Sequence, residues 1–455
     1  MRSDPRQRHH LFPDLMDNRA SSLAGLIRHG LGLAVVGVVI GVACWPLNVV
    51  DRVQSALFGS LPTDATGAWS STGVLVAMLP MLVMPMLLLL QRGPWKAGAG
   101  SGIPSTMNAL EDPSLMPRAM AAQSTMQRSV LWAIATLAMF PLGREGPVVQ
   151  VGAAVARALH QRWGQWLPSL SERQLVAIGG GAGLAGGFNT PLLGVVFMLE
   201  ELTTEYAITT LWPALVISAA AAGFSNLGGE PLFGLGVINV MTSEPEQLLM
   251  AIPIGIAGGV AGGLFSKGLV EASRRLQPWV ERFPIRTGLC LGAGLAGLAL
   301  LSWGTSCGDG EALLHQLITE GMPNADRDAG MWGAGLTSLW ITATRVLGPL
   351  LALAPGVPGG LIDPSLAFGG LLGYTICAVI GASQHLGIAL GLAAGLSGAT
   401  QLPLVSIVFA WRLTGDQQLF AGVVLAAVVA AYTGRLLARQ PVYHALALLQ
   451  SAPRR

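Results

Sequence analysis

The chain has 455 residues, of which 52% are hydrophobic and 11% are charged. Soluble domains carry a charge on about a quarter of their residues, so this composition excludes an ordinary soluble enzyme or binding protein. The net charge of +2, without a basic patch interleaved with aromatic residues, argues against nucleic acid as a partner. Long apolar runs recur along the chain, which predicts an all-α polytopic membrane protein.

The cysteines and histidines show no spacing typical of a metal site or a disulfide framework. We therefore expect neither a metal nor another cofactor, and we interpret the cysteines of the apolar runs as small buried side chains. The four cysteines are Cys44, Cys290, Cys307 and Cys377.

Both ends of the chain are rich in arginine, which predicts that both termini are cytoplasmic and that the number of full crossings is even. Residues 1–22 are interpreted as a cytoplasmic tail. The apolar run Leu23–Val50 is too long, and starts too late, for a cleavable signal peptide, so it predicts a spanning helix. The arginines are Arg2, Arg6, Arg19 and Arg28 at one end and Arg435, Arg439, Arg454 and Arg455 at the other.

Two features follow the first span. The polar segment 51–70 predicts an extracytoplasmic loop, and Gly73–Leu90 predicts a second span. The segment Ala97–Pro104 is rich in glycine, contains Ser101 and ends in proline. Its opened backbone would turn N–H donors toward an anion. The alternative for this segment alone is a flexible linker.

The most informative stretch is Gly143-Arg144-Glu145-Gly146-Pro147, which joins two apolar runs. An acidic side chain at mid-membrane costs roughly 2.5–3.5 kcal/mol, so it tends to be functional and to face a water-filled path. The glycines let the backbone open, and Pro147 favours the first turn of a new helix. The stretch predicts an anion site made of backbone N–H groups beside one titratable acid, Glu145. The alternative is a helix–loop–helix corner with a glutamate near the headgroups.

Glycines cluster again at Gly179–Gly183 and before Pro191, which we interpret as a third break in the helices. The apolar stretch Leu192–Leu199 follows and ends in Glu200 and Glu201. Segments of this length are too short to span a membrane, and non-helical backbone at membrane depth lies inside protein or lines a cavity. The short pieces therefore predict a permeation pathway.

The second half also alternates between spans and breaks. A polar, acidic loop is predicted over residues 304–330, and Arg345 in the next span is interpreted as reaching the membrane surface at a helix end. A fourth break follows at Pro355–Pro364. The predicted spans and short pieces are Leu211–Phe224, Leu248–Val270, Thr287–Trp303, Trp332–Leu353, Gly370–Gly381, Ile388–Gly398, Leu402–Trp411 and Leu419–Leu437.

The two halves resemble each other in sequence, with the glutamate of the Gly143–Pro147 stretch in one copy only. Paired broken segments of this kind predict a transporter with an ion site where two inverted repeats meet. We expect a first repeat at 23–227, a linker at 228–246, a second repeat at 247–440 and a pore-lining end at 441–455. The matches, at shifts of 212 and 217 residues, are Gly183-Leu184-Ala185-Gly186 with Gly395-Leu396-Ser397-Gly398, Pro191 with Pro403, Gly143 with Gly360, Pro147 with Pro364 and Gly152 with Gly369.

In this order, the motifs resemble the CLC family of chloride channels and chloride/proton antiporters over about residues 30–450. The resemblance implies a homodimer in membrane lipid, with one pore in each subunit and with chloride and protons as partners. Because 12 residues follow Tyr443, it is closest to bacterial inner-membrane members without regulatory C-terminal domains. It also implies a three-part selectivity filter, made of Gly100, Ser101, Gly102, Ile103 and Pro104; Gly143, Arg144, Glu145, Gly146 and Pro147; and Gly360, Leu361, Ile362, Asp363 and Pro364.

The same resemblance implies roles for single residues. Chloride would be held by the hydroxyl groups of Ser101 and Tyr443 and by the backbone N–H groups of Leu361 and Ile362. Glu145 resembles the gating glutamate, which competes with the anion when ionised and swings out when protonated.

Glu201 resembles the intracellular proton-transfer acid of the antiporters. Without the resemblance, Glu201 would be a glutamate at a helix end facing the cytoplasm, which is how we interpret Glu200. Without it, Tyr443 would be an aromatic residue of the membrane interface.

The third filter segment departs from the family, which usually has Phe and then Ala where this chain has Ile362 and Asp363. A carboxylate there would weaken chloride binding unless it is protonated or turned away. Fluoride-exporting relatives typically depart at the filter serine and the tyrosine, and both are present here as Ser101 and Tyr443, which favours chloride.

We expect chloride/proton antiport. One alternative is a passive, voltage-gated type of chloride channel with the same fold, acting as an electrical shunt, for example in acid resistance. That alternative is favoured if Asp363, or the absence of the usual Phe at Ile362, disrupts the coupling path. The remote alternative is an intramembrane enzyme, against which we find no Ser/His or Cys/His nucleophile arrangement and no paired acids with metal-ligand spacing.

Overall fold

The computed structural model describes residues 23–59, 61, 69–164, 170–203, 208–227, 235, 243–322 and 330–451. The predicted tail 1–22, most of the predicted linker 228–246 and the terminal Arg454 and Arg455 lie outside these ranges. The predicted repeat boundaries stay a prediction.

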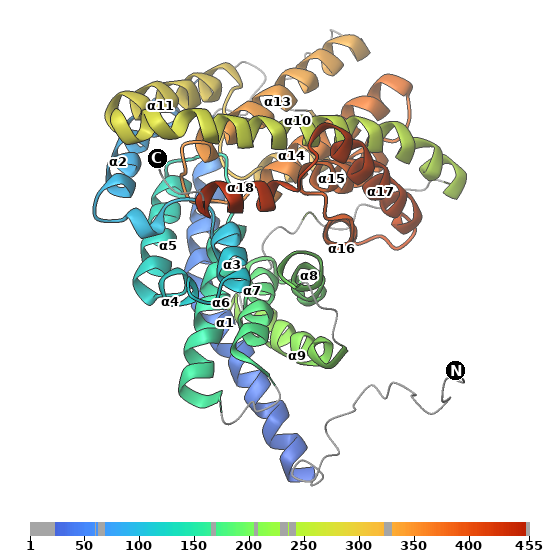
Figure 1. Cartoon of the computed structure of the whole chain (residues 1–455). Coiled ribbons are helices and arrows are strands. Elements are labelled where there is room, and N and C mark those ends of the chain that lie inside the picture. The colour runs from blue at the N-terminus through green and yellow to red at the C-terminus, as the bar shows by residue number, and fades with distance from the viewer. Residues whose placement is uncertain are drawn as a thin grey trace.

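The described part of the chain is helical, as the apolar runs predict (Figure 1). The helices of the first half are α1 (Leu23–Phe58), α2 (Ser71–Arg92), η1 (Lys96–Gly98), α3 (Gly102–Glu111), α4 (Met116–Ala119), α5 (Ala122–Leu137), α6 (Glu145–Trp163), α7 (Glu172–Phe188), α8 (Pro191–Phe197), the π-helix η3 (Met198–Leu202) and α9 (Ile208–Phe224).

The helices of the second half are α10 (Glu244–Arg282), α11 (Pro284–Leu301), α12 (Glu311–Thr319), α13 (Gly330–Leu353), α14 (Ile362–Ile380), α15 (Gln384–Thr400), α16 (Pro403–Thr414), α17 (Phe420–Leu437) and α18 (Val442–Ser451). In Figure 1, most of the first half (blue to green) occupies the lower part of the view, and most of the second half (yellow to red) the upper part. The exception is α2, which packs against α11 of the second half.

Among the described helices, seven are long and apolar enough to cross a membrane: α1, α2, α10, α11, α13, α14 and α17. The length and apolar composition of these helices confirm the prediction of an all-α polytopic membrane protein. The even number of crossings stays a prediction.

The repeat is visible in the backbone of α6–α7–α8 and α14–α15–α16. Asn189 ends α7 with a φ of 48°, and Gln401, at the equivalent position 212 residues later, ends α15 with a φ of 61°. Each is followed by a helix that starts at a proline. The break before Pro191 is therefore a real helix end, and it occurs in both halves.

Several predictions about local structure are wrong. The glycines Gly179–Gly183 do not break the chain, because they lie inside α7. A Cβ atom on Gly152 of α6 would overlap the Gly179 carbonyl, and the equivalent Gly369 packs in the same way on Gly391 of α15. These glycines let neighbouring helices approach closely, which is their usual use in membranes.

The predicted loop 51–70 begins later than expected, because α1 continues through Asp51 to Phe58. The predicted loop 304–330 contains α12. In both places acidic residues made the segment look solvent-exposed, but Asp51 and Asp309 are buried.

Arg345 does not reach the membrane surface. It is fully buried on α13, and its guanidinium donates to the carbonyls of Gly308 and Cys307 at 2.7 and 2.8 Å. It therefore holds the turn that precedes α12. Two smaller differences are that α14 starts at Ile362 rather than Gly370, and that Cys290 is exposed on α11 rather than buried.

Candidate functional site

The two helix-start loops of the repeats meet face to face. The amide of Gly143 donates to the carbonyl of Gly360 at 3.0 Å, and the amide of Gly360 donates back to Gly143 at 2.8 Å. These two residues are equivalent at the shift of 217, so the bridge joins the repeats at their pseudo-symmetry axis. Trp132 of α5 also donates to the Gly143 carbonyl, at 3.0 Å. The bridge brings the first turns of α6 and α14 together, and helix N-termini favour negative charge.

Glu145 places its carboxylate on the start of α14. Its Oε1 atom accepts a hydrogen bond of 2.6 Å from the backbone amide of Asp363, and the side chain is fully buried. This amide belongs to the first turn of α14, whose N–H groups have no partner within the helix. The carboxylate lies so close to Gly143 and Gly360 that a Cβ atom on either glycine would overlap it. The carboxylate thus occupies a position in which the backbone amide at the start of α14 favours an anion.

The segment that carries Ser101 is held in place from two sides. The amide of Gly100 donates to the carbonyl of Gly356 at 2.8 Å, and Gly100 has a φ of 75°, which favours glycine. Arg128 of α5 is buried and donates to the carbonyls of Gly100 and Ala99 at 3.0 and 3.1 Å. The flexible-linker alternative for this segment is therefore wrong.

The two hydroxyl groups singled out by the resemblance are buried and have no hydrogen-bond partner among the described residues. They are Ser101 Oγ, which faces Gly146 of α6, and Tyr443 Oη on α18. Tyr443 interacts electrostatically with Glu145, Glu201 and Asp363, so it lies near both predicted proton-carrying acids. A buried hydroxyl without a partner costs free energy, which an anion would remove. Tyr443 is not an interface residue, because its exposed fraction is 0%.

Two amides of the third predicted filter segment have no hydrogen-bond acceptor among the described residues. In the described structure the amides of Leu361 and Ile362 donate to no backbone carbonyl, while the next amide, of Asp363, binds Glu145. Sequence reasoning named the first two donors and missed the third. The signal was present, because Asp363 is the second residue of the helix that starts after Gly359–Gly360.

The two neighbouring glutamates after α8 differ in their surroundings. Glu200 accepts hydrogen bonds from the amides of Leu404 and Val405, at 3.0 and 2.8 Å, and so caps α16 of the other repeat. Glu200 therefore lies near a helix end, as predicted, with its carboxylate bound to another helix; its cytoplasmic orientation stays a prediction. Glu201 is buried and lies 3.4 Å from His444, measured from Oε1 to Nδ1. Burial separates Glu201 from an ordinary helix-end glutamate.

Comparison with known proteins identifies the family that this arrangement belongs to. Residues 81–435 match the family model described as voltage gated chloride channel. The chain belongs to this family. Membership of the voltage gated chloride channel family makes the chain an ion-transport protein rather than an enzyme, and it confirms the resemblance on which the site prediction rests.

Individual members of the family align over most of the chain. The H(+)/Cl(-) exchange transporter ClcA of Salmonella typhimurium is 28% identical over 431 residues, which cover 90% of this chain and 86% of ClcA. A solved CLC-type fluoride/proton antiporter has a TM-score of 0.71 at 23% identity, covering 93% of this chain and 99% of its own. A slow cyanobacterial Cl-/H+ antiporter has a TM-score of 0.72 at 20% identity, covering 93% and 98%. These structures confirm the predicted fold.

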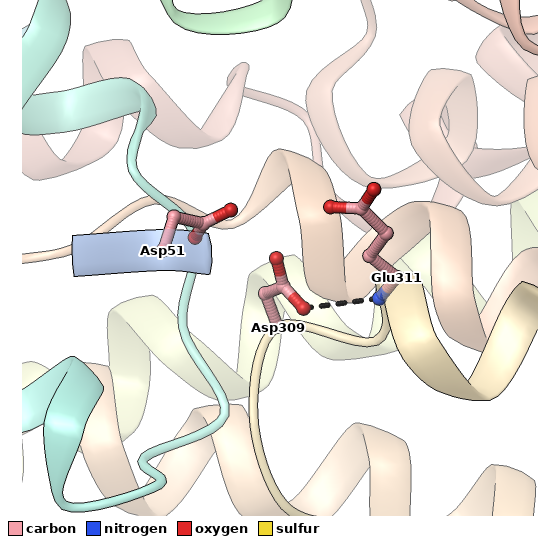
Figure 2. Close-up of side chains that lie close together, drawn as sticks. All are labelled: Asp51, Asp309 and Glu311. Atoms are coloured by element: carbon pink, nitrogen blue, oxygen red, sulfur yellow. Dashed lines mark hydrogen bonds between the residues drawn. The ribbon is translucent and has the colours of Figure 1, made fainter. Parts of the chain in front are cut away.

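Beside the predicted filter lies a cluster of three acids that sequence analysis missed, of which Asp51 and Asp309 are buried and Glu311 is partly exposed. Figure 2 shows Asp51 of α1, Asp309 before α12 and Glu311 at the start of α12, with Asp309 accepting a hydrogen bond of 3.0 Å from the Glu311 amide. Their carboxylate oxygens lie within 4.8 Å of one another, as metal ligands do. However, the guanidinium of Arg144 already pairs with Asp51 and lies 3.9 Å from Glu311. The positive charge of this cluster comes from arginine, and we infer no metal.

Asp363 belongs to the same charged group. Its carboxylate is fully buried, neither oxygen has a hydrogen-bond partner among the described residues, and it interacts electrostatically with Glu145 and Arg144. Five acids thus face two buried arginines, Arg144 and Arg345. Carboxyl groups outnumber the two arginines in this group, and an unpaired charge is costly in a low-dielectric interior. The five acids are Asp51, Glu145, Asp309, Glu311 and Asp363.

A cavity of about 730 Å³ connects the filter with the surface. Ser101 and Leu361 lie at its inner end, and the exposed side chains of Arg92 and Lys96 line its outer part together with one acid, Glu281. Two cations against one anion at the mouth favour the approach of an anion.

Proposed function

We propose that this protein exchanges chloride for protons across a bacterial inner membrane. The observation that carries the proposal is the position of the Glu145 carboxylate, which accepts the 2.6 Å hydrogen bond from the first turn of α14 in place of an anion. The similarity to ClcA, a named H(+)/Cl(-) exchange transporter, supports the same activity. Coupling needs a group whose protonation decides whether the anion can bind, and a buried acid that occupies an anion-binding position has that property.

In the proposed mechanism, chloride binds between hydroxyl and amide donors. Ser101 and Tyr443 supply the hydroxyl groups, which are otherwise unpaired, and Leu361 and Ile362 supply amides at the start of α14. No cation is needed, because the helix start and the hydroxyl groups provide the positive ends of dipoles. The anion reaches this site from the cavity past Arg92 and Lys96.

Glu145 couples the two ions because its charge decides which ligand holds the amides. When ionised, it occupies the donors and closes the site. When protonated, it loses most of its attraction for them, and chloride takes its place. By linkage, a bound chloride favours protonation of Glu145 by the same factor as protonation favours chloride.

Glu201 carries protons between the cytoplasm and Glu145 in this proposal. It is buried, and Tyr443 interacts electrostatically with both Glu201 and Glu145. The structural reason for choosing Glu201 over Glu200 is that Glu200 is committed to the amides of α16.

A passive chloride channel is the second candidate, and Asp363 is the observation that favours it. An ionised Asp363 would repel both chloride and the Glu145 carboxylate. This repulsion would disturb the replacement of one by the other at the amides of α14. The excess of acids over arginines around Asp363 supports a neutral, protonated Asp363 instead, and such a group leaves antiport intact.

The assembly and orientation follow the same proposal. We propose a homodimer in lipid, with both termini in the cytoplasm and with the repeats at 23–227 and 247–440. The cavity that leads to Ser101 would then open to the cytoplasm. The substrate is proposed to be chloride rather than fluoride, because Ser101 and Tyr443 are both present.

The deciding experiment measures proton movement in proteoliposomes under an outward chloride gradient, with the voltage clamped by potassium and valinomycin. Proton uptake against its own gradient, lost in Glu145→Gln while chloride flux persists, is the expected result. Chloride flux without proton movement in the unaltered protein would make it a channel. Persistent proton pumping in Glu145→Gln would refute the role of Glu145.

A further inference from the structure

Glu201 needs a route to cytoplasmic water, because its side chain is only 1% exposed. The group that faces it is the imidazole of His444, whose Nδ1 atom lies 3.4 Å from Glu201 Oε1. The His444 side chain is 47% exposed. Glu201 is therefore enclosed by protein, and His444 lies at the protein surface.

We propose that His444 is the residue through which protons pass between the cytoplasm and Glu201. The inference rests on the proposed antiport. His444 follows Tyr443 in the sequence and lies on α18. This helix is not among the seven that are long and apolar enough to span a membrane.

The chemistry of histidine suits this step. Its ring changes charge near neutral pH and has two nitrogen atoms that bind protons independently. The Glu201 carboxylate, 3.4 Å from the ring, favours the charged ring and raises the pKa of His444 above its ordinary value. Glu111 of α3, the helix that packs on α18, acts on the ring in the same direction. Glu201 and Glu111 are the charged groups that act on this ring.

The transfer is balanced in protons and charge. The imidazolium gives its Nδ1 proton to the Glu201 carboxylate, which leaves a neutral ring protonated at Nε2 and a neutral carboxylic acid. Rotation of the half-exposed ring then brings Nδ1 to water, where it takes up the next proton. Exposed side chains change rotamer within nanoseconds, far faster than a transport cycle. The reverse sequence releases a proton to the cytoplasm.

The neighbouring acid is a poorer candidate for the same step. Glu200 is also partly exposed, but its two oxygens accept hydrogen bonds from Leu404 and Val405 at the start of α16. Moving the Glu200 carboxylate to carry a proton would uncap that helix. Proton transfer between His444 and Glu201 does not require the loss of a helix cap.

The test uses the full-length protein in proteoliposomes and compares His444→Gln with the unaltered protein and with His385→Gln, a change at another exposed histidine. We expect the ratio of protons to chloride to fall by about tenfold in His444→Gln. This is less than the ~100-fold effect typical of an essential proton-transfer group, because water can replace it in part. Chloride flux should persist, and His385→Gln should keep the original ratio.

Two further readouts separate proton transfer from a purely structural role. The proton-to-chloride ratio of the unaltered protein should fall as the cytoplasmic-face pH rises through the ring's pKa, whereas that of His444→Gln should stay flat. Imidazole added to His444→Ala should restore proton movement, while phosphate at equal buffering capacity should not.

Unchanged ratio and pH profile in His444→Gln would overturn the assignment while leaving antiport in place. Loss of both ion fluxes in the two variants, without rescue by imidazole, would overturn it as well. Absence of proton movement in the unaltered protein would instead refute the antiport on which the assignment rests.

Discussion

Replacing Glu145 tests the central contact of the site, because in the proposed mechanism the side chain and a chloride ion compete for the same donors. The structure places Oε1 at 2.6 Å from the Asp363 amide, which makes this a charge-assisted hydrogen bond. Such bonds contribute about 1.5–3 kcal/mol net, against about 0.5–1.5 kcal/mol for neutral ones. A glutamine in the same place would therefore hold the amide less tightly, by about 1–1.5 kcal/mol.

The expected result is that Glu145→Gln binds chloride about five- to tenfold more tightly than the unaltered protein at neutral pH. Glu145→Ala removes the competitor altogether, so the full 1.5–3 kcal/mol applies and the gain should be about ten- to 150-fold. Competition for one binding position predicts that chloride affinity decreases from Glu145→Ala to Glu145→Gln to the unaltered protein.

Isothermal titration calorimetry with chloride in detergent measures these affinities. Lowering the pH should shrink the difference between the unaltered protein and Glu145→Gln, because a protonated glutamate resembles glutamine. Ser101→Ala in the Glu145→Gln background serves as the control for binding at the filter and should weaken chloride binding. Equal or weaker binding in Glu145→Gln, or a difference that does not depend on pH, would refute the competition.

Three further predictions follow from the same structure. Glu201→Gln should keep chloride flux and lose proton movement in proteoliposomes, and loss of both would contradict its role as a proton carrier. Gly360→Ala should raise uncoupled chloride flux, because its Cβ would overlap the Glu145 carboxylate and displace it. Gly297→Ala is the control and should behave as the unaltered protein, because there is open space around Gly297. Equal coupling in both variants would count against the position described for the Glu145 carboxylate. Arg345→Met should lower the melting temperature in detergent, because it leaves the Cys307 and Gly308 carbonyls buried without donors at a cost of about 1–3 kcal/mol each. The exposed Arg439→Met is its control, and equal melting temperatures would show that Arg345 does not hold the turn.

Much of the architecture was readable from the order of residues. Apolar runs of sufficient length marked the spans, and prolines after short polar breaks marked the starts of α8 and α16. The matches between the halves located Gly143 and Gly360, which proved to be hydrogen-bonded to each other. These predictions rest on local rules, because backbone hydrogen bonds in lipid must be satisfied within each segment.

Charged and small residues were the source of most errors. Acidic residues suggested loops at Asp51 and Asp309, and Arg345 suggested a helix end, but partners from distant segments bury all three. The glycines at 179–183 suggested a break, yet they serve helix packing. Whether a polar residue is exposed or paired depends on segments far away in the sequence, and periodicity carries no information about them.

By itself, therefore, the sequence determined the membrane setting, the repeat and the identity of the acid at the centre of the filter, since these follow from composition, spacing and motif. Only the tertiary structure decided that Glu145 binds the amide of Asp363, that Asp51 pairs with Arg144, and that Glu201 faces His444. Each of these contacts joins residues at least 93 positions apart. Such pairs form only when packing brings separate helices together, and a hydrogen bond or ion pair then depends on distances of a few ångströms that no sequence pattern specifies.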